Sequence, residues 1–326
     1  SLNIKAPIPV RITSPLENYC GKQIDQRRNV IQINTIKPTP RKMQLQLATW
    51  NSRSINKKSA AICDLVISKR IDVLALTETW ISDKTNYSTN LATTTAEITN
   101  TLKDHQFIHI PRLARRGGGV GVLLRKGLVV KQNDIIQFQA MEYIDLTISC
   151  NHSKRLSIRL ITIYRPPPSE KNNLTMSMFL QDFSTLLEHL TTVPEHLIFI
   201  GDFNVHMDDP TNSDAAKFAD LLDSAGLIQR VTGATHKRGH TLDLLIHRED
   251  DTILAGNIDI VSNLPSDHFA IVYPLAMEKP KPSKLIVKCR NFRRIDMEVF
   301  RSDILDSSLH SATKTCDANA LTMEYN

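Results

Sequence analysis

The stretch that most constrains this chain is Leu197-Ile198-Phe199-Ile200-Gly201-Asp202-Phe203-Asn204. The four apolar residues at its start predict a fully buried β-strand. Gly201 lets the backbone turn at the end of that strand, so Asp202 and Asn204 are expected to project side by side from its carboxyl end. Open α/β sheets place their ligands at such ends. A carboxylate beside an amide suits phosphate chemistry, because the carboxylate can hold a metal ion or a proton and the amide can donate to an oxyanion.

Other polar residues also lie at or beside predicted strand ends. Glu78 follows the buried run Val73–Thr77, and Asn51 follows the alternating segment Leu45–Trp50. The remaining members of this set are Tyr164, Asp243, Ser266, Asp267 and His268. Hydrolysis of a phosphodiester needs an activated water, a cation near the phosphate oxygens and help for the leaving alkoxide. Carboxylates can hold a hard cation, His beside a carboxylate can act as a base, and Tyr and Asn can donate to developing negative charge.

The bulk composition is that of an ordinary globular protein and excludes several classes. The 326 residues are 41% hydrophobic and 23% charged, which allows a large core. No apolar run is long enough to span a bilayer, so no membrane partner is expected. The five cysteines are scattered without a Cys-x-x-Cys pair, which argues against a zinc ribbon and indicates a reducing, intracellular compartment. The chain also lacks a Gly-rich phosphate loop and a Gly-x-Ser-x-Gly elbow.

The positive charge is concentrated near the start of the chain. Residues 1–44 hold eight Lys and Arg against two acidic residues, which accounts for the whole net charge of +6. Five prolines and the lack of sustained periodicity predict that residues 1–43 form a basic, loosely ordered lead-in. Such a segment is either a solvated linker or a basic tail that touches nucleic acid. Residues 277–326 begin with Lys279-Pro280-Lys281-Pro282, turn polar and are interpreted as a linker.

Residues 44–276 predict one folded α+β domain. Its further strand candidates are β-branched and alternating: Phe107–Ile110, Val120–Arg125, Val129–Ile136, Tyr143–Cys150, Leu156–Tyr164, Leu242–His247 and Phe269–Pro274. Its helix candidates show helical spacing of apolar residues: Lys57–Arg70, Phe179–Leu190 and Phe218–Ala225. Residues 82–100 are expected to form a loop or a weak helix. Many antiparallel strands with a few interleaved helices favour two packed sheets.

Seven short motifs follow one another along residues 45–275. They are Thr49-Trp50-Asn51-Ser52-Arg53-Ser54, Leu76-Thr77-Glu78-Thr79-Trp80, Gly117-Gly118-Gly119-Val120-Gly121-Val122, Tyr164-Arg165-Pro166-Pro167, Gly201-Asp202-Phe203-Asn204, Thr235-His236 with Leu242-Asp243-Leu244, and Ser266-Asp267-His268. Their kind and order resemble the endonuclease/exonuclease/phosphatase superfamily, which includes apurinic endonucleases and deoxyribonuclease I. The resemblance implies a four-layer α/β sandwich of two packed mixed sheets with flanking helices, and a metal-dependent phosphodiester hydrolase.

Two of these stretches resemble a narrower group. Tyr164-Arg165-Pro166-Pro167 and Gly239-His240-Thr241-Leu242-Asp243-Leu244 are similar to the endonuclease domain of LINE-type, non-LTR retrotransposons. That resemblance implies nicking of double-stranded DNA in the nucleus, leaving a 3′-hydroxyl for target-primed reverse transcription. Residues 277–326 would then lead toward a reverse transcriptase region, and regions outside this chain would bind the element's own RNA.

The resemblance also implies a role for each site residue. Glu78 would bind Mg²⁺, or Mn²⁺ in its place, with Asn51 and Asp267 assisting. Asp202 would deprotonate or position the attacking water. Three residues would act on the phosphate: Asn204 would hold it, Tyr164 would donate a hydrogen bond to it, and His268 would contact one of its oxygens. Asp243 would lie behind His268 and fix the tautomer of the His268 ring.

Four basic residues are nominated for DNA contact: Arg115, Arg116, Lys237 and Arg238. A basic rim around an anionic site is what binding of the DNA backbone requires. The loop His236–His240 is short, and no apolar wedge for an abasic sugar is evident, which favours nicking of intact, deformable DNA.

The site residues also have structural readings, which stay open at this point. Tyr164 could be a core aromatic residue with a satisfied hydroxyl, and Asp243 could hold a turn. Two alternative functions also remain: a phosphoesterase of the same fold that acts on a substrate other than DNA, and an inactive transposon-derived binding domain.

Overall fold

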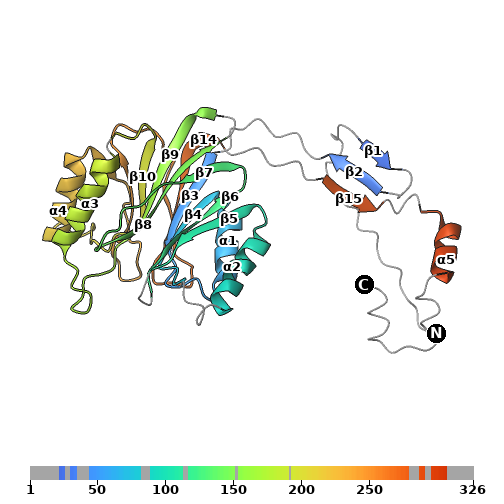
Figure 1. Cartoon of the computed structure of the whole chain (residues 1–326), viewed down its shortest axis with the longest axis horizontal. Helices are drawn as coiled ribbons and strands as arrows, with labels where there is room; N and C mark the ends of the chain where they lie inside the picture. Colours follow the sequence, from blue (N-terminus) through green and yellow to red (C-terminus); the bar gives the residue numbers. More distant parts are fainter. Residues whose placement is uncertain are drawn as a thin grey trace. The chain divides into compact units, whose positions relative to one another are not determined.

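The computed structural model describes residues 22–25, 30–34, 44–81, 89–112, 117–150, 153–190, 192–278, 286–290 and 295–306. The chain divides into two compact units, whose elements are labelled in Figure 1. The larger unit is Arg41–Pro282, and the predicted domain 44–276 lies within these bounds. The smaller unit combines Ser1–Pro40 with Ser283–Asn326.

The larger unit is built on two six-stranded mixed sheets. The first, called the β3 sheet, has the order β13-β14-β3-β4-β6-β5. Its strands are β3 (Gln44–Asn51), β4 (Val73–Thr77), β5 (His105–Ile110), β6 (Val120–Arg125), β13 (Asp259–Val261) and β14 (Ala270–Glu278). Strands β3 and β4 pair in parallel, and the other pairs are antiparallel.

The second, called the β10 sheet, has the order β11-β12-β10-β9-β8-β7. Its strands are β7 (Leu128–Gln132), β8 (Glu142–Cys150), β9 (Ser153–Tyr164), β10 (His196–Asp202), β11 (Leu227–Gln229) and β12 (Asp243–Arg248). Only β9 and β10 pair in parallel among the pairs of this sheet. Each sheet therefore contains one parallel pair, whose carboxyl ends lie at the same sheet edge.

Helices cover the outer faces of the two sheets and complete four layers (Figure 1). They are α1 (Ser59–Lys69) and α2 (Thr89–Thr101) on the β3 sheet, and α3 (Met176–Leu190) and α4 (Ser213–Ser224) on the β10 sheet. The side chains between the sheets are almost all aliphatic, as alternation along strands with one inward face requires. The predicted four-layer α/β sandwich is confirmed.

The layer between the β10 sheet and its helices is rich in phenylalanine. Phe179 and Phe183 lie one helical turn apart on α3 and contact Phe218 of α4, with ring centroids 5.4 and 5.3 Å away. Phe203, directly after Asp202, packs into the same cluster. This apolar anchor fixes the backbone around the polar residues that flank Phe203.

Several boundaries differ from the sequence-based expectations. Residues 82–100 were expected to form a loop or weak helix, and α2 occupies Thr89–Thr101. The helix expected at Phe218–Ala225 is α4, which begins earlier, at Ser213. The side chain of Asn212 accepts hydrogen bonds from the amides of Asp214 and Ala215 and caps the helix there. None of the helices in the described part of the chain is long and apolar enough to cross a membrane.

The smaller unit contains regular structure where the sequence predicted little. Strands β1 (Lys22–Asp25), β2 (Val30–Asn34) and β15 (Ile286–Arg290) form an antiparallel sheet in the order β1-β2-β15. Helix α5 spans Met297–Leu305. Residues 1–43 were expected to be loosely ordered, and strands β1 and β2 depart from this expectation.

Candidate active site

Strand register places three polar residues in a row across one edge of the β10 sheet. In the parallel pair of β9 and β10, Tyr164 lies beside Asp202. On the other side of β10, the antiparallel strand β12 begins with Asp243 directly opposite Asp202. Asp202 is therefore flanked by Tyr164 and Asp243 at the carboxyl end of a buried strand.

The turn at Gly201 explains how Asp202 reaches this position. Gly201 has a φ of +128°, and a Cβ there would lie 2.0 Å from the carbonyl oxygen of Ile163 on β9. Only glycine allows β10 to approach β9 so closely with this backbone conformation. Asn204 also has a positive φ, 48°, a conformation that asparagine tolerates better than most residues.

Asp202 is fully buried and is held by three nitrogen donors. The side-chain nitrogen of Asn51 donates to Asp202 Oδ2 at 2.7 Å, and that of Asn204 donates to the same oxygen at 3.0 Å. The backbone amide of Asn204 donates to Oδ1 at 3.0 Å. A second bond from Asn204 Nδ2 to the carbonyl of Arg165, at 2.7 Å, fixes the Asn204 amide. The Asp202 carboxylate is thus oriented before any ligand binds.

The pKa of Asp202 is raised to about 7. Burial is the main cause, and the negative charge of Asp243 adds to it. The charge of His268 and the hydrogen bonds from Asn51 and Asn204 act in the opposite direction. A carboxylate with a pKa near neutrality can accept a proton from a bound water at physiological pH.

His268 comes from the loop that leads into β14 and faces Asp202 from the other sheet. Its Nδ1 lies 2.8 Å from Asp243 Oδ2, and its Nε2 lies 3.9 Å from Asp202 Oδ2. Burial disfavours the imidazolium, but the charge and hydrogen bond of Asp243, together with the charge of Asp202, raise the pKa of His268 to about 9. His268 is therefore a cation at neutral pH, with Nε2 turned toward the Asp202 carboxylate.

Asn51 links Asp202 to Glu78 across the two sheets. Its Nδ2 donates to Glu78 Oε1 at 3.0 Å as well as to Asp202. Its Oδ1 accepts the backbone N–H of Arg53 at 2.9 Å, so the nitrogen of the amide faces the two carboxylates. The other oxygen of Glu78 accepts a hydrogen bond from Trp80 Nε1 at 3.0 Å. The role of Asn51 as a metal ligand stays a prediction.

Asp267 carries the second carboxylate that was predicted to bind a metal. Arg53 Nη1 lies 2.5 Å from Asp267 Oδ2, and His236 Nε2 lies 3.3 Å from the same oxygen. Burial works to raise the pKa of Asp267, but the charge of Arg53 and hydrogen bonds outweigh it and lower that pKa. Neither Arg53 nor His236 was given a role from sequence, although both lie within the quoted motifs.

Tyr164 is buried in the core between the sheets, with only 4% of its surface exposed. The guanidinium carbon of Arg112 lies 5.5 Å from the centroid of its ring. Burial, followed by the charges of Glu78 and Asp202, raises the pKa of Tyr164. The hydroxyl therefore keeps its proton at neutral pH and can serve as a donor.

The charge balance of the site favours a bound cation. Four carboxylates meet here: Glu78, Asp202, Asp243 and Asp267. Three cations oppose them: Arg53 on Asp267, His268 between Asp202 and Asp243, and Lys58, which interacts with the charges of Asp267 and Glu78. One buried carboxylate oxygen, Asp243 Oδ1, has no hydrogen-bond partner among the residues that the structure describes. An acid-rich site with more carboxylates than cations fits a divalent metal ion.

Of the four residues nominated for DNA contact, two lie in the described part of the chain. Lys237 and Arg238 are exposed on the loop 236–240. The amide of Lys237 donates to the carbonyl of Asp267 at 2.8 Å, so this loop borders the site. Arg115 and Arg116 lie outside the described residues.

The fold and the acidic site define a phosphoesterase of the two-sheet sandwich class. Residues 48–268 match the endonuclease/exonuclease/phosphatase family, and the chain belongs to this family. Its members are typically hydrolytic phosphoesterases that use divalent metal ions. Among curated proteins, none matches the chain.

Solved structures share the fold at low sequence identity. The endonuclease domain of TRAS1, a telomere-specific non-LTR retrotransposon, is 14% identical, with 73% of this chain and all of that chain covered and a TM-score of 0.55. An AP endonuclease from Archaeoglobus fulgidus is 18% identical over 72% of this chain and all of that one, with a TM-score of 0.52. TDP2 from D. rerio, complexed with single-strand DNA product, is 15% identical, with 72% of this chain and 99% of that chain covered and a TM-score of 0.52. At these identities the likeness shows the fold alone.

Proposed function

We propose that this protein is a metal-dependent endonuclease that nicks double-stranded DNA. The observation that carries the proposal is the pairing of a buried proton acceptor with a fixed cation: Asp202, whose pKa is near neutrality, lies 3.9 Å from the Nε2 of the charged His268. Hydrolysis of a phosphodiester needs these two functions next to each other, one for the water and one for the phosphate.

In this proposal Asp202 accepts the proton of the attacking water. Asn51 and Asn204 hold the Asp202 carboxylate by hydrogen bonds of 2.7 and 3.0 Å, so it does not need to reorient during the reaction. The water oxygen forms a bond to phosphorus while the bond from phosphorus to the 3′-oxygen breaks. The products are a 5′-phosphate and a 3′-hydroxyl.

The negative charge that develops on the phosphate is met by donors from both sheets. His268 offers the N–H of a charged imidazole, and Asp243 holds that ring through Nδ1 at 2.8 Å. Tyr164 offers a hydroxyl whose raised pKa keeps it protonated. Such fixed donors stabilise charge at little reorganisation cost. Both N–H bonds of the Asn204 side chain are used by Asp202 and by the Arg165 carbonyl, so Asn204 would contact the phosphate only by giving up one of these bonds.

Carboxylates of Glu78 and Asp267 would hold the metal ion. Mg²⁺ is the proposed ion and Mn²⁺ its substitute, because hard cations prefer oxygen ligands. When bound, the ion supplies charge neutralisation for the phosphate oxygens and for the leaving oxygen. Asn51 would position Glu78 through its amide nitrogen, at 3.0 Å in this structure.

DNA is the proposed substrate because exposed cations border an otherwise acidic site. Lys237 and Arg238 lie on the loop that is anchored to the Asp267 carbonyl. The nucleases among the structural relatives support this choice at the level of fold. We further infer that the nick supplies a 3′-hydroxyl for target-primed reverse transcription of a non-LTR element in the nucleus, together with the element's own RNA.

A plasmid-nicking assay tests the proposal. Supercoiled plasmid should be converted to open circles in Mg²⁺ and stay intact in excess EDTA, and primer extension should detect 3′-hydroxyl ends. Parallel reactions with a phosphomonoester and with an abasic oligonucleotide test the alternative substrates. Equal nicking in EDTA, or hydrolysis of the phosphomonoester without nicking, would reject the proposed function.

A further inference from the structure

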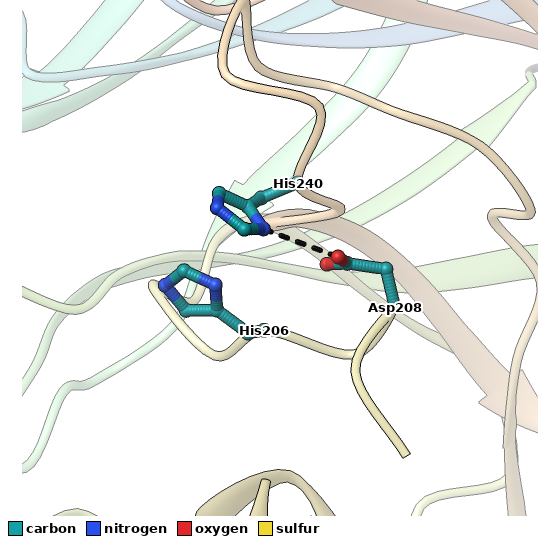
Figure 2. A group of neighbouring side chains, drawn as sticks. All are labelled: His206, Asp208 and His240. Atoms are coloured by element: carbon teal, nitrogen blue, oxygen red, sulfur yellow. Dashed lines mark hydrogen bonds and ion pairs between the residues drawn. The ribbon is translucent and has the colours of Figure 1, made fainter. Parts of the chain in front are cut away.

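A second cluster of ligating side chains lies outside the residues given roles in the reaction. Figure 2 shows His206, Asp208 and His240 turned toward one another. His206 and Asp208 lie on the loop between β10 and α4, and His240 lies on the loop that precedes β12. One ligand atom from each of the three residues lies within 4.8 Å of the other two.

The carboxylate of Asp208 is already oriented within this cluster. Its Oδ1 accepts the backbone N–H of Thr241 at 2.7 Å. Its Oδ2 lies 3.1 Å from His240 Nδ1, the contact drawn as a dashed line in Figure 2. The hydrogen bond from the backbone amide to Oδ1 also fixes the position of Oδ2. Ligands in metal sites are commonly held in this way by hydrogen bonds from groups that do not touch the metal.

The two imidazoles are also held close to each other. The ring centroids of His206 and His240 lie 4.1 Å apart, with the planes at 63°. The side chains of His240 and Asp208 are 37% and 29% exposed, so an ion can enter from solvent and keep a water ligand. Two imidazoles, one carboxylate and a water form a donor set typical of zinc. Mg²⁺ prefers oxygen donors alone and would be disfavoured here.

We propose that His206, Asp208 and His240 bind a transition-metal ion of the Zn²⁺ class, separate from the Mg²⁺ site. The ion would join the loop after Asn204 to the loop that carries His236. Direct bonds already connect these segments, since the amide of Met207 donates to the carbonyl of Thr241 at 3.3 Å and the amide of Thr241 donates to Asp208 Oδ1 at 2.7 Å. The metal would therefore act as a clamp on two loops that border the active site.

The test is a direct binding measurement without DNA. Metal-free protein is titrated with Zn²⁺ by calorimetry in millimolar Mg²⁺, which would saturate the proposed Mg²⁺ site. Co²⁺ is used in parallel, because its visible absorption reports nitrogen ligands in a four-coordinate site. We expect one Zn²⁺ per chain. The double variant His206→Ala/His240→Ala should weaken binding by more than about 100-fold, beyond the range for loss of an outer-shell partner.

The control is His196→Ala. His196 pairs with Asp251 at 2.7 Å and is 34% exposed, close to the value for His240, but it lies at the opposite end of β10 from Asp202. This variant should bind Zn²⁺ like the wild type. If circular dichroism shows that the double variant does not fold, His240→Gln alone serves the same comparison.

Three results would overturn the proposal. The first is a wild-type chain that binds no Zn²⁺ in Mg²⁺. The second is equal affinity in the wild type and in the folded His206 and His240 variants. The third is an ion that persists in those variants and is lost in His236→Asn, because it would belong to the neighbouring His236, Asp267 and His268 group.

Discussion

Asp202 and His268 approach each other from different sheets, with Asp202 Oδ2 3.9 Å from His268 Nε2. The distance is too long for a direct hydrogen bond. Each group is instead held by other partners, Asp202 by Asn51 and Asn204, and His268 by Asp243. The pair is therefore preorganised by its surroundings. Because Asp202 Oδ2 already accepts from both Asn51 and Asn204, a water would bind at Oδ1, beside the amide of Asn204, while His268 Nε2 would contact a phosphate oxygen.

Replacing Asp202 by Asn should abolish turnover and spare DNA binding. The change keeps the shape of the side chain but removes the proton acceptor, and loss of a general base typically costs about 10²–10⁴-fold in rate. Nicking rate and binding anisotropy are measured separately. A variant that loses binding but keeps its rate per complex would show that Asp202 has a different role. Asp223→Asn, on the exposed surface of α4, is the control.

The pH dependence of kcat/KM should be bell-shaped. Asp202 must be ionised to accept a proton, so activity should rise through its pKa of about 7. His268 must be charged to bind the phosphate, so activity should fall through its pKa of about 9. Asp243→Asn removes the charge that most raises the pKa of His268, and the falling limb should move to lower pH.

The matched control for this shift is Asp251→Asn, which removes the charged partner of His196 far from the site. Its pH profile should equal that of the wild type. A falling limb that stays in place in Asp243→Asn would remove His268 from the proposed role.

Glu78→Gln should raise the Mg²⁺ concentration needed for half-maximal nicking by more than about tenfold, because changes in ligands and their supports typically cost at least that much in affinity. Glutamine can still accept the hydrogen bond from Trp80, but it loses the bond that Asn51 Nδ2 donates to Glu78, so circular dichroism must confirm that the variant folds. A Mg²⁺ titration of the nicking rate measures the shift. Glu97→Gln, on α2 where Glu97 accepts a bond from Ser59, is the control. An unchanged titration would exclude Glu78 as a ligand.

Gly201→Ala should destabilise the fold by about 3 kcal/mol or more, because it combines a positive φ with a Cβ placed 2.0 Å from the Ile163 carbonyl oxygen. Gly226→Ala is a matched control, since Gly226 also has a positive φ, +63°, but its Cβ would meet nothing within 4 Å. That variant should cost only about 1–2 kcal/mol. Chemical denaturation measures both. Equal losses would mean that the close approach of β9 and β10 is not what requires glycine.

The sequence predicted the strand ends well because short buried runs carry their own signal. Asp202 and Glu78 each follow an apolar run, and parallel pairing brings such ends to one sheet edge. Contacts between loops are different. Arg53 and Asp267 are 214 residues apart, and no periodicity indicates that their loops face each other. Long sequence separation also explains why the strands of the smaller unit were not predicted. Strand β2 alternates apolar and polar residues, but its partner β15 lies at the other end of the chain.

The four basic residues nominated for DNA contact should act as two pairs with different roles. Each phosphate contact contributes a slope of about one unit in log K against log salt. Arg115→Ala/Arg116→Ala should flatten this slope by up to about two units and weaken binding to all sequences alike. Salt titrations of binding on two unrelated duplexes measure this.

Lys237→Ala/Arg238→Ala should instead change which steps are nicked. These exposed residues lie on a short loop whose backbone is bonded to Asp267, so the loop keeps a fixed position beside the site. A basic loop in that position can respond to the width of the DNA groove. Sequencing of nick positions on one plasmid tests this, with Lys217→Ala on α4, which lies on the outer helical layer, as the control. A nick map identical to that of the wild type, together with an unchanged salt slope in the Arg115 and Arg116 variant, would reject the assignment of backbone binding to Arg115 and Arg116 and of site choice to Lys237 and Arg238.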